Sequence, residues 1–329
     1  MEKKQDNLME ISDLTVRYNT DDAVVHAVNN FNLKLVRGEA RGLVGETGAG
    51  KTTLALSILR LLPERVGEVT GGSIVYDGQE LLNLPEAEML PLRGKRISMI
   101  FQDPMTSLNP TQTVGDQILE VLNLHFPEMT RDEKNKRVDE MMTLVGIPPQ
   151  RKKSFPHEFS GGMKQRVVIA MALVAEPELL LADEPTTALD VTIQAQILEL
   201  MKQLREKFNT SVMLITHDLG VVAQFCDSVS VVYAGRVVEY GPVEIVFQRK
   251  ENHPYTAGLF NCIPNLHDDQ PRLHPIAGHM ADPRVEYKGC CFADRCEYAT
   301  ERCRTEAPSM HVCGEHGILC HRYDGKEEF

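Results

Sequence analysis

The sequence has no apolar run long enough to cross a membrane as a helix. Its longest run, Val167–Ala175, is bounded by Arg166 and Glu176, whereas a membrane-spanning helix needs about 20 apolar residues. The first residues, MEKKQDNLMEISDL, also lack the apolar stretch of a secretory signal. We therefore expect a cytosolic chain that meets a membrane only through its partners.

The sequence also lacks an excess of basic residues. It has 35 Lys and Arg against 47 Asp and Glu, a formal net charge of −12 and a pI of about 5.4, which disfavours a nucleic-acid binder. It contains no repeat of solenoid length and no low-complexity tract. With 329 residues, 42% apolar and 25% charged, the composition is that of a globular protein, either one large domain with an appendage or two modest domains.

The most informative segment is GLVGETGAGKTT, residues 42–53. A predicted strand (40–45) precedes it and a predicted amphipathic helix (51–62) follows, which is the context that a phosphate-binding loop requires. The glycines let backbone N–H groups turn toward phosphate oxygens, Lys51 supplies charge to the outer phosphates, and Thr52 supplies a hydroxyl to Mg²⁺. The predicted nucleoside triphosphate site comprises Gly45, Glu46, Thr47, Gly48, Ala49, Gly50, Lys51, Thr52 and Thr53.

A second candidate element is the apolar run Leu179–Asp183, predicted to be a buried strand. It delivers Asp183 to the Mg²⁺ shell, and Glu184 is placed to polarise the attacking water. Alone, such a pair is equally consistent with a solvated strand end. Gln102 and His217 each follow another predicted strand; His217 is a candidate for contact with the γ-phosphate, although a lone residue there is more often structural.

Ser160, Gly161 and Gly162 precede a predicted helix that reaches about Val174. Ser160 suits an N-cap, and the glycines expose backbone donors that an anion can use. In isolation, a simple capped helix is the better explanation. Because the chain has one phosphate loop, a second phosphate-binding helix start is most simply explained if it faces the nucleotide of a second subunit.

Predicted strands and helices alternate along the chain, which indicates an α/β fold with central parallel strands. The clearest predicted helix covers 130–145, where Thr130 and Glu133 form a capping box, and Asp77-Gly78 marks a hairpin. The pattern weakens beyond residue 241. We place a boundary near residue 265, which gives domains 1–265 and 266–329.

Six of the eight cysteines lie between Cys290 and Cys320. In a cytosolic chain, this clustering favours metal binding over disulfides. The spacing Cys290-x5-Cys296-x6-Cys303-x16-Cys320 differs from the paired C-x2-C of a zinc ribbon. Four thiolates suit a [4Fe–4S] cluster, with zinc or no metal as the alternatives. Nearby arginines are expected to favour thiolates by offsetting their charge, namely Arg295, Arg302 and Arg304.

Taken together, these residues resemble the nucleotide-binding subunit of ABC transporters over about residues 8–245. The resemblance identifies the Walker A loop as Gly45–Thr52, the Q-loop residue as Gln102 and the signature as Ser160–Met163. It also identifies the Walker B strand with its glutamate as Leu179–Glu184, the D-loop as Ala188–Asp190, the switch histidine as His217 and the adenine-stacking aromatic as Tyr18. It implies a P-loop NTPase fold of the ABC type: a mostly parallel sheet, an antiparallel β subdomain, an α-helical subdomain at about 103–175, and a small Cys-rich C-terminal extension.

The same resemblance implies Mg²⁺-dependent ATP hydrolysis. Glu184 is then the base, His217 and Gln102 complete the catalytic set, and the Mg²⁺ ligands are Thr52, Gln102 and Asp183. In this family, ATP closes two nucleotide-binding domains head to tail, so that each signature meets the partner's nucleotide. The implied nucleotide contacts therefore also include Ser160, Gly161, Gly162 and Asp190.

Other segments resemble the oligopeptide, dipeptide and nickel importer branch of the family. Phe159 and Met163 replace the leucine and glutamine of the commoner L-S-G-G-Q signature, and this variant resembles the signature of that branch. The segments FQDPMTSLNP (101–110) and His253–Thr256 also resemble that branch. Branch members with a similar tail carry a [4Fe–4S] cluster, which implies the ligands Cys290, Cys296, Cys303 and Cys320, with Cys291 and Cys313 outside the pattern.

The branch resemblance implies an ATPase subunit that powers di- or oligopeptide uptake from the cytoplasmic face of the cell membrane. The implied partners are a second ATPase subunit, identical or not, two transmembrane permease subunits and an extracytoplasmic substrate-binding protein, with no nucleic acid. Nickel or another small solute is the alternative cargo. A soluble ATPase that acts on ribosomes or DNA is disfavoured, because the chain has one Walker A loop and no long coiled coil between Lys51 and Ser160. Glu184 and His217 disfavour a non-enzymatic iron–sulfur protein.

Overall fold

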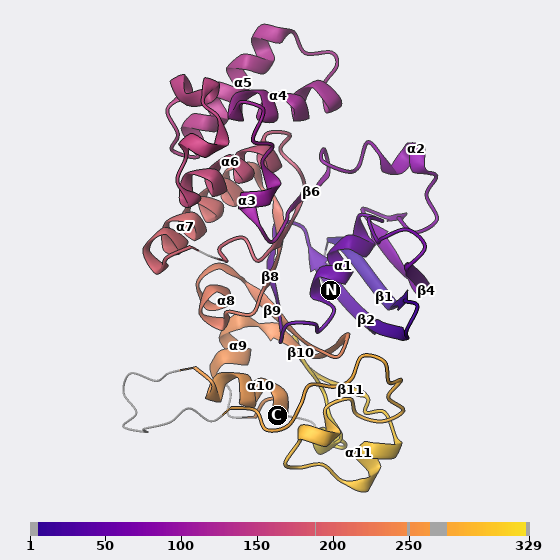
Figure 1. Ribbon diagram of the computed structural model, residues 1–329. Coiled ribbons are helices and arrows are strands. Elements are labelled where there is room, and N and C mark those ends of the chain that lie inside the picture. The colour runs from indigo at the N-terminus through magenta and orange to yellow at the C-terminus, as the bar shows by residue number, and fades with distance from the viewer. Residues whose placement is uncertain (1–5, 188, 249–250, 264–274, 327–329) are drawn as a thin grey trace. The chain divides into compact units, whose positions relative to one another are not determined.

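The structure is a computed structural model that describes residues 6–187, 189–248, 251–263 and 275–326 (Figure 1). The chain divides into two units. The first contains residues 1–7, 35–40 and 83–215, and the second contains residues 8–34, 41–82 and 216–329. The boundary predicted near residue 265 falls outside the described residues and stays a prediction.

The first unit is built on parallel strands. β7 (Leu179–Asp183) lies between β6 (Ile97–Ile100) and β8 (Ser211–Thr216), with Ile97 beside Leu179 and Leu179 beside Ser211. Every residue of β7 and β8 is buried, which explains their continuous apolar sequences. Both predicted central strands are confirmed, and their carboxyl ends deliver the polar residues that follow them to one edge.

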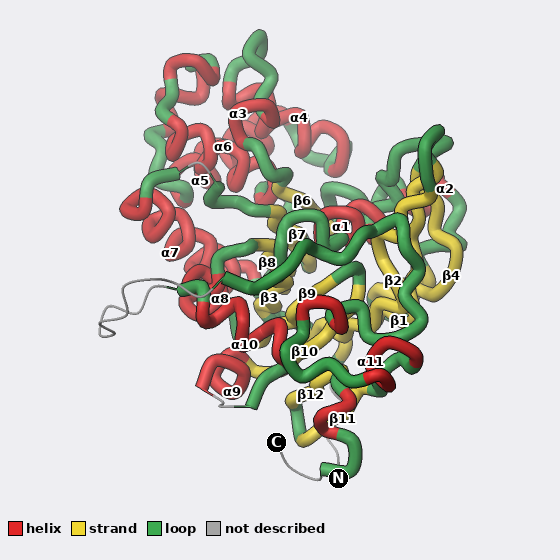
Figure 2. Tube along the Cα trace, turned by 60° about the horizontal axis from the view of Figure 1, so that its bottom comes forward, coloured by secondary structure: helices red, strands yellow, loops and turns green. Residues whose placement is uncertain are grey.

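Helices make up the rest of the first unit: α2 (Glu86–Met89), α3 (Pro104–Ser107), α4 (Val114–His125), α5 (Arg131–Leu144), α6 (Gly161–Leu173) and α7 (Val191–Phe208). Helices α3 to α6 gather together in both views (Figures 1 and 2). The predicted capping box is present at the start of α5, where Thr130 and Glu133 bond each other's backbone. The apolar side chains of α5 point into the core, and Val138, Met141 and Met142 are at most 1% exposed.

The second unit contains an antiparallel sheet with the strand order β2-β1-β4-β5. Its strands are β1 (Asn7–Asn19), β2 (Val24–Val36), β4 (Gly67–Tyr76) and β5 (Gln79–Glu80). Asp77 and Gly78 join β4 to β5 with φ values of +48° and +78°, as a two-residue hairpin turn requires. The predicted hairpin and the antiparallel β part of the fold are therefore confirmed.

This unit also contains a second set of paired strands, of which β3 leads into the phosphate loop. β3 (Ala40–Val44) runs parallel to β9 (Ser228–Tyr233), and β9, β10 (Arg236–Pro242), β12 (His316–Leu319) and β11 (Met310–Cys313) follow as antiparallel neighbours. The cysteine-rich tail is thus joined to β10 through β12. This unit also contains α1 (Lys51–Ile58), α8 (Leu219–Phe225), α9 (Val243–Gln248), α10 (Pro254–Asn261) and α11 (Glu301–Thr305).

Helix α1 is shorter than predicted, because Arg60 takes a left-handed backbone conformation with φ +53°. Its N–H bonds to the carbonyl of Ser57 and ends the helical pattern. Across the described residues, no helix combines the length and the apolar character needed to cross a membrane.

Candidate nucleotide site and cysteine cavity

The loop between β3 and α1 approaches other backbone segments so closely that two of its glycines have no substitute. A Cβ at Gly45 would lie 2.1 Å from the carbonyl oxygen of Val232, and one at Gly50 would lie 2.2 Å from that of Ala27. Gly50 also has φ +96° at the N-cap of α1, where a side chain is strained. The glycines therefore allow a tight turn at this place, and the N–H groups of the turn and of the helix start suit an anion.

Lys51 is folded back over this loop. Its side chain is buried, with only 6% of the residue exposed, and its Nζ donates to the carbonyl oxygens of Gly45 (2.7 Å) and Glu46 (3.0 Å). A buried ammonium needs such acceptors. The loop carbonyls of Gly45 and Glu46 therefore hold the lysine over the loop.

Glu46 is held by residues from the C-terminal part of the chain. Its N–H donates to Tyr255 Oη (2.9 Å), and its carboxylate accepts two hydrogen bonds from Arg295 (2.7 and 3.1 Å). The sequence did not reveal these contacts. Tyr255 lies in the His253–Thr256 motif and Arg295 lies between two candidate cluster cysteines, so both belong to segments already singled out for other reasons.

Three of the other residues of this segment are accessible. Thr47, Gly48 and Thr52 are exposed, whereas Ala49 is buried. Tyr18, the candidate adenine-stacking residue, is half-buried and donates from its hydroxyl to Thr53 Oγ1 (3.2 Å). This hydrogen bond ties the aromatic ring to the first turn of α1.

The candidate catalytic glutamate lies in the first unit, directly after β7. Asp183 ends that strand and is 2% exposed, and Glu184 has φ +47°, a left-handed conformation that costs a non-glycine residue about 1–3 kcal/mol. The Glu184 carboxylate accepts from Gln102 Nε2 (3.0 Å) and from the Thr187 hydroxyl (3.0 Å). The structure thus brings together Glu184 and Gln102, as predicted for one site, and adds Thr187.

The remaining motif residues have identifiable local roles. His217 is exposed and follows β8; its neighbour Asp218 caps α8 by accepting from the N–H groups of Gly220 and Val221. Asp190 caps α7 by accepting from Ile193 N–H (3.0 Å). Ala188 lies outside the described residues. His217 belongs to the second unit with the phosphate loop, whereas Asp190 belongs to the first.

The start of α6 differs from a conventional capped helix. Ser160 occupies the N-cap position as predicted, but its side chain makes no capping hydrogen bond there, and the first turn holds no acidic residue. A Cβ at Gly162 would lie 2.7 Å from Ile193 Cγ2 on α7, whereas one at Gly161 would meet only Leu189 at 3.8 Å. Close packing of α6 on α7 therefore accounts for Gly162 without a ligand, and it does not account for Gly161.

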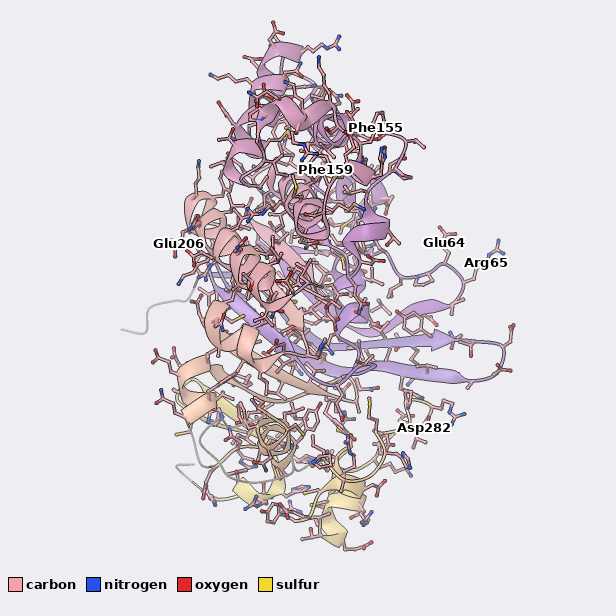
Figure 3. The ribbon with its side chains drawn as sticks, turned by 60° about the vertical axis from the view of Figure 1, so that its left-hand side comes forward. Glu64, Arg65, Phe155, Phe159, Glu206 and Asp282 are labelled. Carbon is pink, nitrogen blue, oxygen red and sulfur yellow. The ribbon has the colours of Figure 1, made fainter. Side chains whose placement is uncertain are left out.

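The two unusual residues of the signature share one contact. The guanidinium of Arg151 lies 4.3 Å from the centre of the Phe159 ring, and its Nη1 lies 3.9 Å from Met163 Sδ. Phe159 is 5% exposed and lies beside the helices of the first unit (Figure 3). Phe159 and Met163 thus clamp an arginine at the helix start, which a leucine and a glutamine would contact differently.

The predicted cluster cysteines lie around one cavity in the second unit. Its lining includes Cys290, Cys296, Cys303 and Cys320, whereas Cys291 and Cys313 lie outside it. Burial raises the pKa of Cys290 to about 12 and also raises the pKa of Cys296 and of Cys320. Among the described residues, no three His, Cys, Asp or Glu side chains are arranged to hold a single metal ion.

The arginines of this segment do not act on the thiols as predicted. Arg295 binds Glu46, Arg302 binds Glu306 and Asp324, and Arg304 binds Asp294. The arginines pair with carboxylates because a hydrogen bond to a charged carboxylate is stronger than one to a neutral thiol. The cation that lines the cavity is instead Arg322, whose charge opposes the rise in the pKa of Cys296 and Cys320.

Comparison with known proteins places these features in one family. The ABC transporter family matches residues 28–187, and the C-terminal region of oligopeptide/dipeptide transporters matches residues 238–303. The oligopeptide transport ATP-binding protein OppD of Haemophilus influenzae is 47% identical over 98% of this chain and 98% of its own length. OppD of Salmonella typhimurium is 50% identical over 92% of this chain and 89% of its own length.

Solved structures agree with the fold. The dimeric post-hydrolysis state of the ATP-binding cassette MJ0796 bound to ADP and Pi matches with a TM-score of 0.64 and 28% identity, over 71% of this chain and 98% of that one. The cbiO1 protein of Clostridium perfringens, part of the ABC transporter complex cbiONQ, matches with a TM-score of 0.65 and 31% identity, over 75% of this chain and 93% of that one. The predicted P-loop fold of the ABC type is therefore confirmed, and the chain belongs to the oligopeptide ATP-binding proteins of the ABC transporter family.

Proposed function

We propose that this chain is the ATP-hydrolysing subunit of an importer that carries di- or oligopeptides across the cytoplasmic membrane. The observation that carries the proposal is the near full-length similarity to OppD proteins, including the C-terminal region of peptide transporters. The phosphate loop, with its glycines and its buried lysine, supports the ATP-binding part of this role.

In the proposed reaction, each group of the site has one task. Lys51 and the loop N–H groups bind the β- and γ-phosphates, and Thr52, Gln102 and Asp183 would hold Mg²⁺, which neutralises developing charge between the phosphates. Glu184 accepts a proton from the attacking water. Its hydrogen bonds from Gln102 and Thr187 support this role, because they orient the carboxylate. His217 contacts the γ-phosphate, and Tyr18 stacks on adenine.

The start of α6 serves a second ATPase subunit in this proposal. Ser160, Gly161 and Gly162 would face the nucleotide held by that subunit, with Asp190 beside them. A helix start without an acidic first turn or a side-chain cap suits a phosphate. The pair docks on two permease subunits at the cytoplasmic face of the membrane and takes peptide from an extracytoplasmic binding protein.

We also propose that the cysteine cavity holds a [4Fe–4S] cluster. Four cysteines around one cavity match the four ligands of such a cluster. The cysteine ligands Cys290, Cys296, Cys303 and Cys320 would then cross-link a tail with little core of its own.

Iron and sulfide analysis tests the cluster. Wild-type protein purified without oxygen should contain iron and acid-labile sulfide, Cys296→Ser should lose both, and Cys313→Ser is the matched control that should retain them. Zinc in place of iron, or equal iron in the Cys296→Ser variant, contradicts the proposed cluster or its ligands.

The transporter role is tested by purifying the chain in detergent from its native membranes and identifying what accompanies it by mass spectrometry. Two polytopic proteins, an ATPase and a binding protein are expected, and the ligand of that binding protein identifies the cargo as peptide, nickel or another solute. Ribosomal or DNA-associated partners in their place would contradict the importer and favour a soluble ATPase.

A further inference from the structure

Glu46, in the phosphate loop, is held at its amide, its carbonyl and its carboxylate. Its N–H donates to Tyr255 Oη (2.9 Å), its carbonyl oxygen accepts from Lys51 Nζ (3.0 Å), and its carboxylate binds both Nη atoms of Arg295 (2.7 and 3.1 Å). A residue fixed at its amide, carbonyl and side chain has little freedom left. Its carbonyl is one of two, with that of Gly45, that hold the Lys51 ammonium.

Arg295 is well built for this task. Its side chain is 5% exposed, and its Nε donates to the carbonyl oxygen of Ala277 (3.0 Å). The guanidinium lies 5.7 Å from the centre of the Tyr233 ring and 5.9 Å from that of Phe292. A guanidinium that binds a carboxylate through two parallel hydrogen bonds fixes the orientation of the carboxylate as well as its distance.

The same region holds Tyr255. This residue is fully buried in α10, and its ring packs on Tyr233 (4.7 Å between centres) and Phe292 (5.5 Å). Phe292 and Arg295 both lie between Cys290 and Cys296. The segment bounded by two cavity cysteines therefore contacts Glu46 directly through Arg295 and indirectly through the ring of Tyr255.

We propose that Arg295 and Tyr255 are positioning residues for the ATP site: through Glu46 they hold Lys51 where the phosphates bind, and so make ATP affinity depend on the order of the cysteine segment. This inference rests on the proposed role of the loop as the ATP site. Neither residue touches a reacting atom. Loosening of the segment 290–296 moves Arg295, releases Glu46 and lets Lys51 leave its position, at a cost in nucleotide affinity.

The test is titration of this chain with ATP in the presence of EDTA, which prevents hydrolysis. Arg295→Met should weaken ATP binding by about tenfold, since small displacements of a binding group are costly, and Arg295→Lys should restore part of the loss because it keeps the charge. Arg302→Met is the matched control: this exposed arginine of the cysteine-rich tail pairs with Glu306 and Asp324, outside the segment 290–296, and its loss should leave ATP affinity unchanged.

A double-mutant cycle tests whether the effect passes through Glu46. The variant with both Glu46→Gln and Arg295→Met should bind ATP no more weakly than Arg295→Met alone, because the second change removes a partner already lost. Additive losses, or a normal affinity in Arg295→Met, would overturn the proposal. Tyr255→Phe keeps the ring packing and removes the acceptor for the Glu46 N–H, so it should weaken ATP binding even if Arg295→Met fails to fold; unchanged affinity in it counts against the inference.

Lys51→Ala separates this inference from the proposed function. Loss of ATP binding in Lys51→Ala with normal binding in Arg295→Met leaves the ATP site intact and removes only the positioning role. Normal ATP binding in Lys51→Ala contradicts the proposed site itself.

Discussion

Helices α1 and α6 both begin in glycine-rich segments, yet their N-termini are built differently. At α1 a Cβ on Gly45 or Gly50 would lie 2.1 or 2.2 Å from a backbone carbonyl oxygen, and Lys51 folds onto the loop carbonyls. At α6 the Ser160 side chain makes no cap, and Gly162 is demanded by packing on Ile193. At α1 a lysine lies over its own loop, whereas at α6 the nearby arginine, Arg151, packs on Phe159 and Met163.

The difference shows that glycines in two similar sequences can be required for different physical reasons, namely close backbone approach at α1 and helix packing at α6. The α1 segment carries its own lysine and hydroxyl residue, and Tyr255 and Arg295 contact its Glu46. The α6 segment has the features of half a site. A division of this kind is expected if each nucleotide lies between one phosphate loop and the helix start of another subunit.

The largest expected effect is the loss of ATP turnover in Glu184→Gln, which should leave ATP binding at the α1 loop unchanged. Removing the base should lower ATP turnover by about 100- to 10,000-fold while ATP still binds at the α1 loop, because the phosphate contacts are intact. Phosphate release and ATP titration measure the two quantities. Glu206→Gln, on the exposed side of α7 (Figure 3), is the control and should match wild type. Unchanged turnover in Glu184→Gln would remove this residue as the base.

Lys51→Ala should have the next largest effect. ATP hydrolysis should fall by about 100-fold or more, as for other groups that stabilise transferring phosphates, and in this variant ATP binding should fall too. Lys202→Ala changes an exposed lysine of α7 and should leave both quantities unchanged. If Lys51→Ala bound ATP normally, the contrast with α6 would lose its basis.

Alanine at Gly161 and at Gly162 should separate packing from ligand binding at α6. Gly162→Ala should lower the free energy of unfolding by about 1–3 kcal/mol, because its Cβ would lie 2.7 Å from Ile193. Gly161→Ala, whose Cβ meets Leu189 at 3.8 Å, should unfold like wild type in denaturant and bind ATP normally as an isolated chain. Equal destabilisation of the two variants would refute the packing argument.

The smallest effect should come from a half-buried ion pair, Glu178 with Arg96 and Arg37, that contrasts with Arg295–Glu46. Hydrogen bonds from Arg96, and then from Arg37, hold the pKa of Glu178 below its ordinary value against the opposing effect of partial burial. Its side chain is 36% exposed, so Glu178→Gln should lower the free energy of unfolding by about 1 kcal/mol or less at pH 7.

The pH dependence of that difference has a definite sign. A carboxylate whose pKa is lowered on folding contributes stability above its unfolded pKa, and loses it as the pH falls through the folded pKa. The gap between wild type and Glu178→Gln in denaturant unfolding should therefore close on acidification. A gap that widened toward low pH would contradict the ion pair.

Sequence reasoning identified the elements with strong local signals. The strand before the phosphate loop, the strands β7 and β8, the hairpin at Asp77-Gly78 and the capped helix α5 were all predicted, because apolar runs, turn residues and capping boxes act over a few residues. The end of α1 was missed, since the backbone conformation of Arg60 has no clear sequence signal. The spacing of the cysteines likewise indicated a shared site, and they do line one cavity.

The tertiary structure alone decided which distant residues support the site. Proximity suggested that Arg295, Arg302 and Arg304 serve the thiols, but the fold gives all three to carboxylates, and one of these, Glu46, lies 249 residues away in the phosphate loop. The sequence by itself determined the family, the phosphate loop and the candidate base, because these depend on residue type at short spacing. The supports of that loop depend on β12 pairing with β10 and on aromatic packing around Tyr255, and such long-range contacts exist only once the chain has folded.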